Sequence, residues 1–176
     1  MQVHLILSVT CDDKPGVVES ISRTIESANA SWLESRLAHL SGKFVGVVQV
    51  RVNAASADTL KQGLSALNKD GIHIICEEIK EPANPGATLT ANFSAIGPDR
   101  IGIVKEISSA FVRQSINVEE LETTLSSMPY SGDPIFEARG QVSIPENLDI
   151  RSLRDRMDAI ADELGLDIDI ETNGVV

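Results

Sequence analysis

Cysteine is scarce in this sequence of 176 residues, which contains only Cys11 and Cys76, far apart along the chain. Two isolated thiols are typical of reduced cysteines in a cytoplasmic protein, because disulfides are rare in that compartment. A disulfide between the two stays open on sequence grounds. The other interpretation treats both as small packing residues, a common role of free cysteine.

Long apolar runs are also absent, and no segment approaches the length that a membrane-spanning helix needs. The first seven residues, MQVHLIL, contain neither the basic segment nor the small-residue cleavage site of a signal peptide. Their alternation fits the first strand of a folded domain better. We therefore expect a cytoplasmic protein that has no membrane partner.

Positive charge is in short supply. The chain has 15 lysines and arginines against 26 aspartates and glutamates, which gives a net charge of −11. No basic cluster interrupts this acidic average. Because phosphate backbones repel such a surface, we expect no direct binding to nucleic acid.

Catalytic and metal-binding patterns are missing as well. The three histidines are scattered along the chain: His4, His39 and His73. None of them forms a glutamate–histidine pair at metal-ligand spacing, and no serine or cysteine has the partner that a nucleophile needs. The adjacent carboxylates of Glu77–Glu78 and of Glu119–Glu120 would point to opposite faces of a strand. We therefore expect a protein that is not an enzyme and uses no metal or cofactor.

What the sequence does contain is an internal repeat. The segment Asp12–Val18, DDKPGVV, returns as Pro98–Val104, PDRIGIV, and its glycine recurs 86 residues later (102 − 16). The apolar positions of the helix-like run that follows recur at the same offset: Val17, Val18, Ile21 and Ile25 become Ile103, Val104, Ile107 and Phe111. The constant offset places the same helix face inward in both halves. The repeat predicts two domains.

We place these domains at residues 1–80 and 88–176, with a linker at 81–87. Two prolines and a glycine fall within residues 80–87, a composition that sustains neither a strand ladder nor a helix. Each half of roughly 85 residues can bury only a modest core. Packing between the halves or between chains is therefore expected to contribute to stability.

Hydrophobic periodicity predicts six elements in the first half. Ser56 is a candidate N-cap for the second helix, and Gly71 is a candidate stop. A short connection at 41–43 predicts a β-hairpin. The predicted elements are a strand at 3–10, a helix from 17 to about 29, strands at 32–40 and 44–52, a helix at 56–68 and a strand at 72–79.

The second half repeats this pattern with a longer hairpin connection at 127–134. Strands are predicted at 88–96, 135–144 and 166–171, with helices from 103 and over 150–164. By the second helix the offset has grown to 93 (153 − 60), which indicates an insertion of seven residues. The last strand alternates apolar residues with Asp167, Asp169 and Glu171, so one of its faces is expected to be acidic and solvated.

The order βαββαβ in each half predicts an α+β protein made of two tandem ferredoxin-like domains. Each would have a four-stranded antiparallel sheet with two helices on one face. In both halves a strand leads through a glycine turn into a helix. Free backbone N–H groups at such a helix start favour a small anion such as a carboxylate.

Simpler roles for the turn residues stay open. Gly16 and Gly102 could merely permit a tight turn. Asp13 and Asp99 could only cap or neutralise the helix start. Lys14 and Arg100 could be solvated, although either could also help to hold a carboxylate.

The turn DKPGVV at residues 13–18, at the head of this element order, resembles that of the ACT domain. ACT domains are small-molecule-sensing modules found on proteins of amino-acid metabolism. The first turn keeps the Asp-x-Pro-Gly form, and the second has the looser form DRIG at residues 99–102. A chain of two such domains resembles the glycine cleavage system transcriptional repressor family, and this resemblance covers nearly the whole chain.

The resemblance implies a ligand site. ACT domains bind an amino acid between the first turn of one unit and an adjacent unit, and backbone groups near the glycine meet its carboxylate. Asp13, Asp99 or Asn117 could accept the amino group. Asn117 matches an asparagine often found in ACT domains, whereas Ser31 stands at the equivalent position of the first half. The candidate ligand-binding residues are Asp13, Lys14, Pro15, Gly16, Val17, Ser31, Asp99, Arg100, Gly102, Ile103 and Asn117.

We therefore expect a non-enzymatic regulator that senses a small amino acid, with glycine as one candidate. The resemblance implies transcriptional regulation through a transcription-factor partner. One alternative is a structural or assembly module that binds nothing small. Another is a regulatory subunit of an enzyme of amino-acid metabolism. Self-association into a homo-oligomer is expected, because the edges of two small sheets invite pairing.

Overall fold

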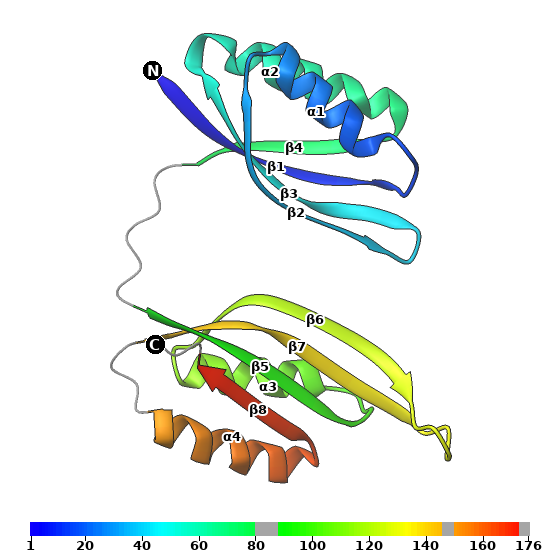
Figure 1. Cartoon of the computed structure of the whole chain (residues 1–176), viewed down its shortest axis with the longest axis vertical. Coiled ribbons are helices and arrows are strands. Elements are labelled where there is room, and N and C mark those ends of the chain that lie inside the picture. Colours follow the sequence, from blue (N-terminus) through cyan, green and yellow to red (C-terminus); the bar gives the residue numbers. More distant parts are fainter. Residues whose placement is uncertain (80–87, 146–149, 173–176) are drawn as a thin grey trace. The chain divides into compact units, whose positions relative to one another are not determined.

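The computed structural model describes residues 1–79, 88–145 and 150–172 (Figure 1). The chain divides between residues 83 and 84 into two compact units. The linker predicted at 81–87 lies outside the described residues, so the domain limits stay predictions. Among the described helices, none is both long and apolar enough to cross a membrane.

The first unit is a four-stranded antiparallel sheet with the strand order β2-β3-β1-β4. Figure 1 shows helices α1 and α2 together on one face of this sheet. The elements are β1 (Gln2–Asp12), α1 (Val17–Ser27), β2 (Ser31–Leu40), β3 (Lys43–Asn53), a 3-10 turn (Ala54–Ser56), α2 (Ala57–Ala66), a second 3-10 turn (Leu67–Asp70) and β4 (His73–Glu78).

The second unit repeats this topology with the strand order β6-β7-β5-β8. Its elements are β5 (Thr88–Pro98), α3 (Ile103–Arg113), β6 (Asn117–Ser127), β7 (Pro134–Pro145), α4 (Ile150–Leu164) and β8 (Asp167–Thr172). The predicted fold class, two tandem ferredoxin-like α+β units, is confirmed.

Each core lies between the sheet and its helices, as the apolar periodicities dictate. In the first unit, alternate residues of β1 such as Leu5 and Leu7 meet Ile21 of α1, and all three are fully buried. Burial of each such side chain contributes about 1.5–3 kcal/mol. In the second unit, Phe93 of β5 and Phe111 of α3 pack edge to face, with ring centroids 5.1 Å apart.

Fewer residues of helices α1 and α3 face the core than the repeat predicted. Val18 and Val104, expected to point inward with their neighbours, are 45% and 43% exposed. Val17 and Ile103, one residue earlier, are buried. Successive residues of a helix are rotated by about 100°, so two adjacent side chains cannot both face the centre of the core.

The start of α2 also differs from the prediction. Ser56 occupies the N-cap position, but its side chain makes no cap hydrogen bond. Instead, the Asn53 side chain accepts a hydrogen bond from the backbone N–H of Ala55 at 3.2 Å, where the preceding 3-10 turn begins. Gly71 ends the following 3-10 turn in the left-handed conformation, with φ +74°, which confirms it as a stop.

The two cysteines cannot form a disulfide in this fold. Cys76 on β4 pairs with Leu7 of β1, four residues away from Cys11 along the same strand. Four residues of strand span about 13 Å, well beyond the reach of a disulfide. Both thiols are free, as the sequence indicated.

We predict that both thiols react slowly with iodoacetamide in the folded protein near neutral pH. Burial raises the pKa of the Cys11 and Cys76 thiols, so little reactive thiolate forms. Cys76, half-buried, should react before Cys11, which is 4% exposed. Mass spectrometry of a time course, with a sample in denaturant as reference, measures both rates. Equal rates for Cys11 in the folded and denatured samples would contradict this placement.

Candidate functional site

The first glycine turn of the repeat joins the end of β1 to the start of α1. Gly16 caps the helix with φ +92° and ψ −2°, a left-handed conformation that glycine adopts readily. Its carbonyl accepts the first helical hydrogen bond, from the Ser20 N–H at 2.9 Å. No side chain in the described part of the chain caps this helix end. The first backbone N–H groups of α1 therefore have no partner within the helix.

An open hollow of about 440 Å³ lies at this helix start. It is wide enough for a small molecule and is open to solvent. The residues that line it come from the turn, the first two turns of α1 and strand β3. They are Asp13, Lys14, Gly16, Val17, Val18, Glu19, Ser22 and Phe44.

Charged side chains of both signs flank the hollow. Lys14 Nζ donates to the carbonyl oxygen of Asp70, a bond that leaves the positive charge of the ammonium group in place. The Asp12 carboxylate pairs with Lys43, which lowers the pKa of Asp12. Asp13, next to it, lines the hollow, and its Oδ2 lies 3.8 Å from His39 Nε2.

The contact between Asp13 and His39 is weak. His39 Nε2 accepts a hydrogen bond from the Gly42 N–H at 3.2 Å, so that nitrogen cannot donate to Asp13 while this bond is made. The Asp13 N–H donates to the Gly42 carbonyl at 2.9 Å and ties the turn to the β2–β3 hairpin. The backbone of Asp13 is therefore anchored, while its carboxylate is available to a ligand.

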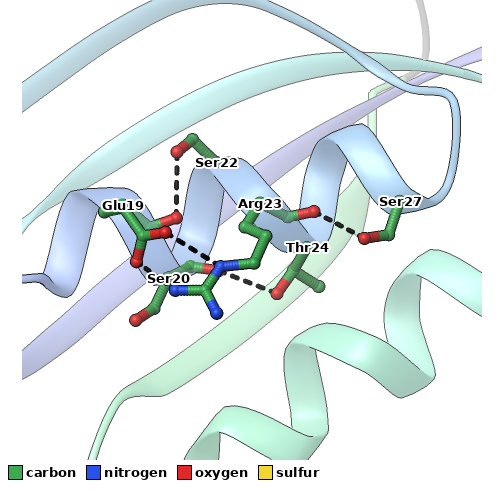
Figure 2. A network of polar contacts seen from close by, with 6 residues as sticks. All are labelled: Glu19, Ser20, Ser22, Arg23, Thr24 and Ser27. Atoms are coloured by element: carbon green, nitrogen blue, oxygen red, sulfur yellow. Dashed lines mark hydrogen bonds and ion pairs between the residues drawn. The ribbon is translucent and has the colours of Figure 1, made fainter.

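Glu19, the acidic residue nearest the start of α1, is held along the helix. Figure 2 shows Arg23 Nε donating to Glu19 Oε1 at 2.9 Å, with a second contact between Arg23 Nη2 and Glu19 Oε2. Arg23 lies one turn further toward the helix C-terminus. The Glu19 carboxylate is thus paired within the helix, although Glu19 also lines the hollow. Figure 2 also shows three hydroxyl groups that donate to carbonyl oxygens about one turn back: Ser22 to Glu19, Thr24 to Ser20 and Ser27 to Arg23.

The second turn has the same backbone. Gly102 caps α3 with φ +100° and ψ −6°, and its carbonyl accepts from the Glu106 N–H at 3.0 Å. Ile103, the first residue of α3, is buried like Val17. The Asp99 N–H donates to the Pro134 carbonyl at 3.0 Å, which ties this turn to the β6–β7 hairpin. The two turns differ in their side chains.

Arg100 and Glu106 form a forked ion pair at the second turn. Arg100 Nη2 donates to Glu106 Oε2 at 2.6 Å, and Nη1 donates to Oε1 at 3.3 Å. This pair lowers the pKa of Glu106 and raises that of Arg100. Glu106 Oε1 lies 3.7 Å from the position of a Cβ built on Gly102. The carboxylate therefore lies beside the start of α3.

Ser31 and Asn117 do not join these turns within their own units. Each is exposed at the first residue of the strand that follows the helix, β2 or β6. Helix α1 has 11 residues and is about 16 Å long, so Ser31 lies at the opposite end from Gly16. The Asn117 side-chain amide donates to Glu119 Oε1 at 2.6 Å. A ligand of amino-acid size at Gly16 does not reach Ser31 of the same unit.

Reasoning from sequence missed Glu106 and Asp70. Asp70 contributes only a backbone carbonyl, which no side-chain pattern reveals. Glu106 could have been noticed in the sequence. Its counterpart 86 residues earlier is Ser20, so a neutral residue of the first half is replaced by an acidic residue in the second. In the described parts of the chain, no group of three or more His, Cys, Asp or Glu side chains could hold a metal ion.

Comparison with known proteins gives one family match, over the first unit. Residues 3–74 match the family model described as ACT domain. No curated protein matches the chain. A crystal structure of an unknown protein from Galdieria sulphuraria is 27% identical, covers 100% of both chains and has a TM-score of 0.83.

A second solved structure matches almost the whole chain. It is described as a "putative glycine cleavage system transcriptional repressor", and it is 15% identical, with 99% of both chains covered and a TM-score of 0.74. Identity at this level shows that the fold is shared. Both comparisons support the two-unit architecture derived above.

Proposed function

We propose that this chain, whose residues 3–74 match the ACT domain family and whose second unit repeats that fold, is a regulatory protein that senses a small amino acid. One observation carries the proposal. The start of α1 at Gly16 has no side-chain cap and opens into a hollow that Asp13 and Lys14 flank. An ACT domain is a regulatory module, so we propose regulation by contact and no catalysis.

The chemistry of the hollow suits a zwitterion. The N–H groups at the start of α1 can donate to the ligand carboxylate, and the helix dipole adds attraction of about 0.3–1 kcal/mol. The charge of Lys14 acts in the same direction. Asp13 can accept the ligand ammonium group. Pro15 and Val17 complete the turn: Pro15 restricts the backbone before Gly16, and Val17 anchors the helix start in the core.

Glycine is the candidate ligand, and a transcription factor is the candidate partner. Both are suggested by the description of a matching structure as a "putative glycine cleavage system transcriptional repressor", with which this chain shares its fold. The net charge of −11 disfavours direct DNA binding, so we propose that regulation passes through a protein partner. A ligand would shift that interaction only by its differential affinity for the two states of the protein.

Self-association and a cytoplasmic location belong to the same proposal. Strands β2 and β4 are the two edges of the first sheet, and β6 and β8 are those of the second. Edge strands leave backbone groups that can pair with another chain. Two free cysteines suit a reducing compartment.

We predict that one or a few amino acids raise the melting temperature of the protein in a thermal-shift screen of all twenty. At a ligand concentration 100-fold above Kd, binding stabilises the folded state by about 2.7 kcal/mol. The variant Gly16→Val should fold but lose the shift, because a β-branched residue resists φ +92° and displaces the N–H groups.

The matched control is Gly132→Val. Gly132 also has a positive φ, +74°, and open space around it, but it lies in the β6–β7 connection. This control should keep the response to the ligand. If no amino acid shifts the folded wild-type protein, the assembly-module alternative replaces the sensor. If Gly16→Val responds like the wild type, the ligand does not bind at this turn.

A further inference from the structure

We infer that only the first unit takes the amino acid, because in the second unit the Glu106 carboxylate pairs with Arg100 beside the helix start and would repel a ligand carboxylate there. This inference rests on the proposed function and names which of the two turns performs it. The second turn is then a copy of the site in which the protein's own Glu106 carboxylate opposes the binding of a ligand carboxylate.

The position of Glu106 carries the inference. Its two carboxylate oxygens are held by Arg100 at 2.6 Å and 3.3 Å, so the group is fixed by a fork of two hydrogen bonds. One of these oxygens lies 3.7 Å from the Cβ position of Gly102, directly beside the turn. Gly102 is half-buried, whereas Gly16 is exposed. Although no side chain makes a cap hydrogen bond at the start of α3, an internal carboxylate thus lies beside the feature that would attract an external one.

The first unit differs at each of these positions. Ser20 replaces Glu106, and its short side chain brings no negative charge to the turn. Lys14 replaces Arg100, and it donates to a backbone carbonyl where Arg100 donates to a carboxylate. The nearby acid, Glu19, is bound by Arg23 further along the helix. The positive character of the first turn is therefore available to a ligand.

A ligand carboxylate at the second turn would have to displace Glu106 from Arg100. The displaced carboxylate would remain on the same helix, six residues after Arg100, and would repel the ligand's negative charge. Both effects act against binding at Gly102. We expect the second turn to bind at least tenfold more weakly than the first.

The test is an exchange of the two residues in the full chain, read by NMR. In ¹H–¹⁵N spectra, the Gly16 and Gly102 amides report on the two turns separately while each of the twenty amino acids is titrated. In the wild type, the Gly16 signal should move with saturation and the Gly102 signal should not. Ser20→Glu should weaken the response at Gly16 at least tenfold, and Glu106→Ser should create a response at Gly102.

Asp158→Ser is the control for the loss of one negative charge, because Asp158 is an exposed residue of α4. This variant should show the same ligand responses at Gly16 and Gly102 as the wild type. Saturation of Gly102 in the wild type with an affinity equal to that of Gly16 would overturn the inference and leave the proposed function standing. The inference would also be overturned if, in the Glu106→Ser protein, the ligand shifted the Gly16 signal and did not shift the Gly102 signal. No response at either turn in any of the proteins would overturn the proposed function and the inference with it.

The ion pair itself can be measured without a ligand. Titration of the Glu106 carboxyl by ¹³C NMR should give a pKa below that of an ordinary glutamate, with Arg100 and Lys105 as the facing cations. In Arg100→Ala the pKa should rise. An ordinary pKa in the wild type would show that the pair does not hold Glu106 in solution, and this too would overturn the inference.

Discussion

Replacement of Gly46 by alanine is expected to destabilise the first unit by about 3 kcal/mol or more, which is a large part of the stability of a small domain. Gly46 lies on the inner strand β3, between Val9 of β1 and Leu37 of β2. A Cβ at this position would lie 2.0 Å from the Arg36 carbonyl oxygen. The φ of +155° adds backbone strain for any other residue. Strand β2 would have to separate from β3 to make room.

Unfolding in urea, followed by tryptophan fluorescence, measures the stability of the first unit. Trp32 is the only tryptophan of the chain and lies on β2, the strand that would have to move. Gly42→Ala is the matched control, because Gly42 also has a positive φ, +80°, but nothing within 4 Å of its Cβ position. This control should lose only about 1–2 kcal/mol through backbone strain. Equal losses for the two variants would show that the close approach of the strands is absent in solution.

Truncation of Phe111 to alanine is expected to destabilise the second unit by about 3–5 kcal/mol. Phe111 is 1% exposed and meets the Phe93 ring edge to face at an interplanar angle of 75°. Its removal leaves a cavity under the sheet and also removes an aromatic pair that contributes about 0.5–1.5 kcal/mol beyond its buried area. Hydrogen exchange of the β7 amides measures the stability of this unit directly.

The control for Phe111→Ala is its neighbour Val112, which is 73% exposed on the same helix. Val112→Ala should change the stability by less than about 0.5 kcal/mol. If Phe111→Ala does not fold, Phe111→Leu retains most of the volume and should lose a smaller, measurable part of the stability. A loss for Phe111→Ala no larger than that for Val112→Ala would contradict the packing of this core.

The two glycine turns differ in their side chains more than in their backbone conformation. Gly16 and Gly102 have nearly the same φ and ψ, and both accept the first hydrogen bond of their helix. The local pattern of strand, glycine and helix is sufficient to produce this backbone. Ser20 and Glu106 then decide whether a carboxylate lies beside the helix start. The twin turns of the repeat are thus expected to differ in function.

Much of the architecture could be predicted from the sequence, because it depends on local periodicity. The order of strands and helices follows from apolar alternation and helical spacing, and the glycine turns follow from residue type. The 86-residue repeat required that both halves fold alike. The excess of acidic residues and the lack of catalytic patterns likewise limit the expected function classes, because charge and residue spacing are properties of the chain itself.

The tertiary structure decided which residues meet. Cys11 and Cys76 share a sheet, but the strand register separates them. Ser31 and Gly16 are both candidate ligand residues, and the length of α1 places them at opposite ends of the helix within one unit. Glu106 reaches Arg100 because the turn brings together two side chains six residues apart. Such contacts depend on register, helix length and side-chain direction, which a one-dimensional pattern does not contain.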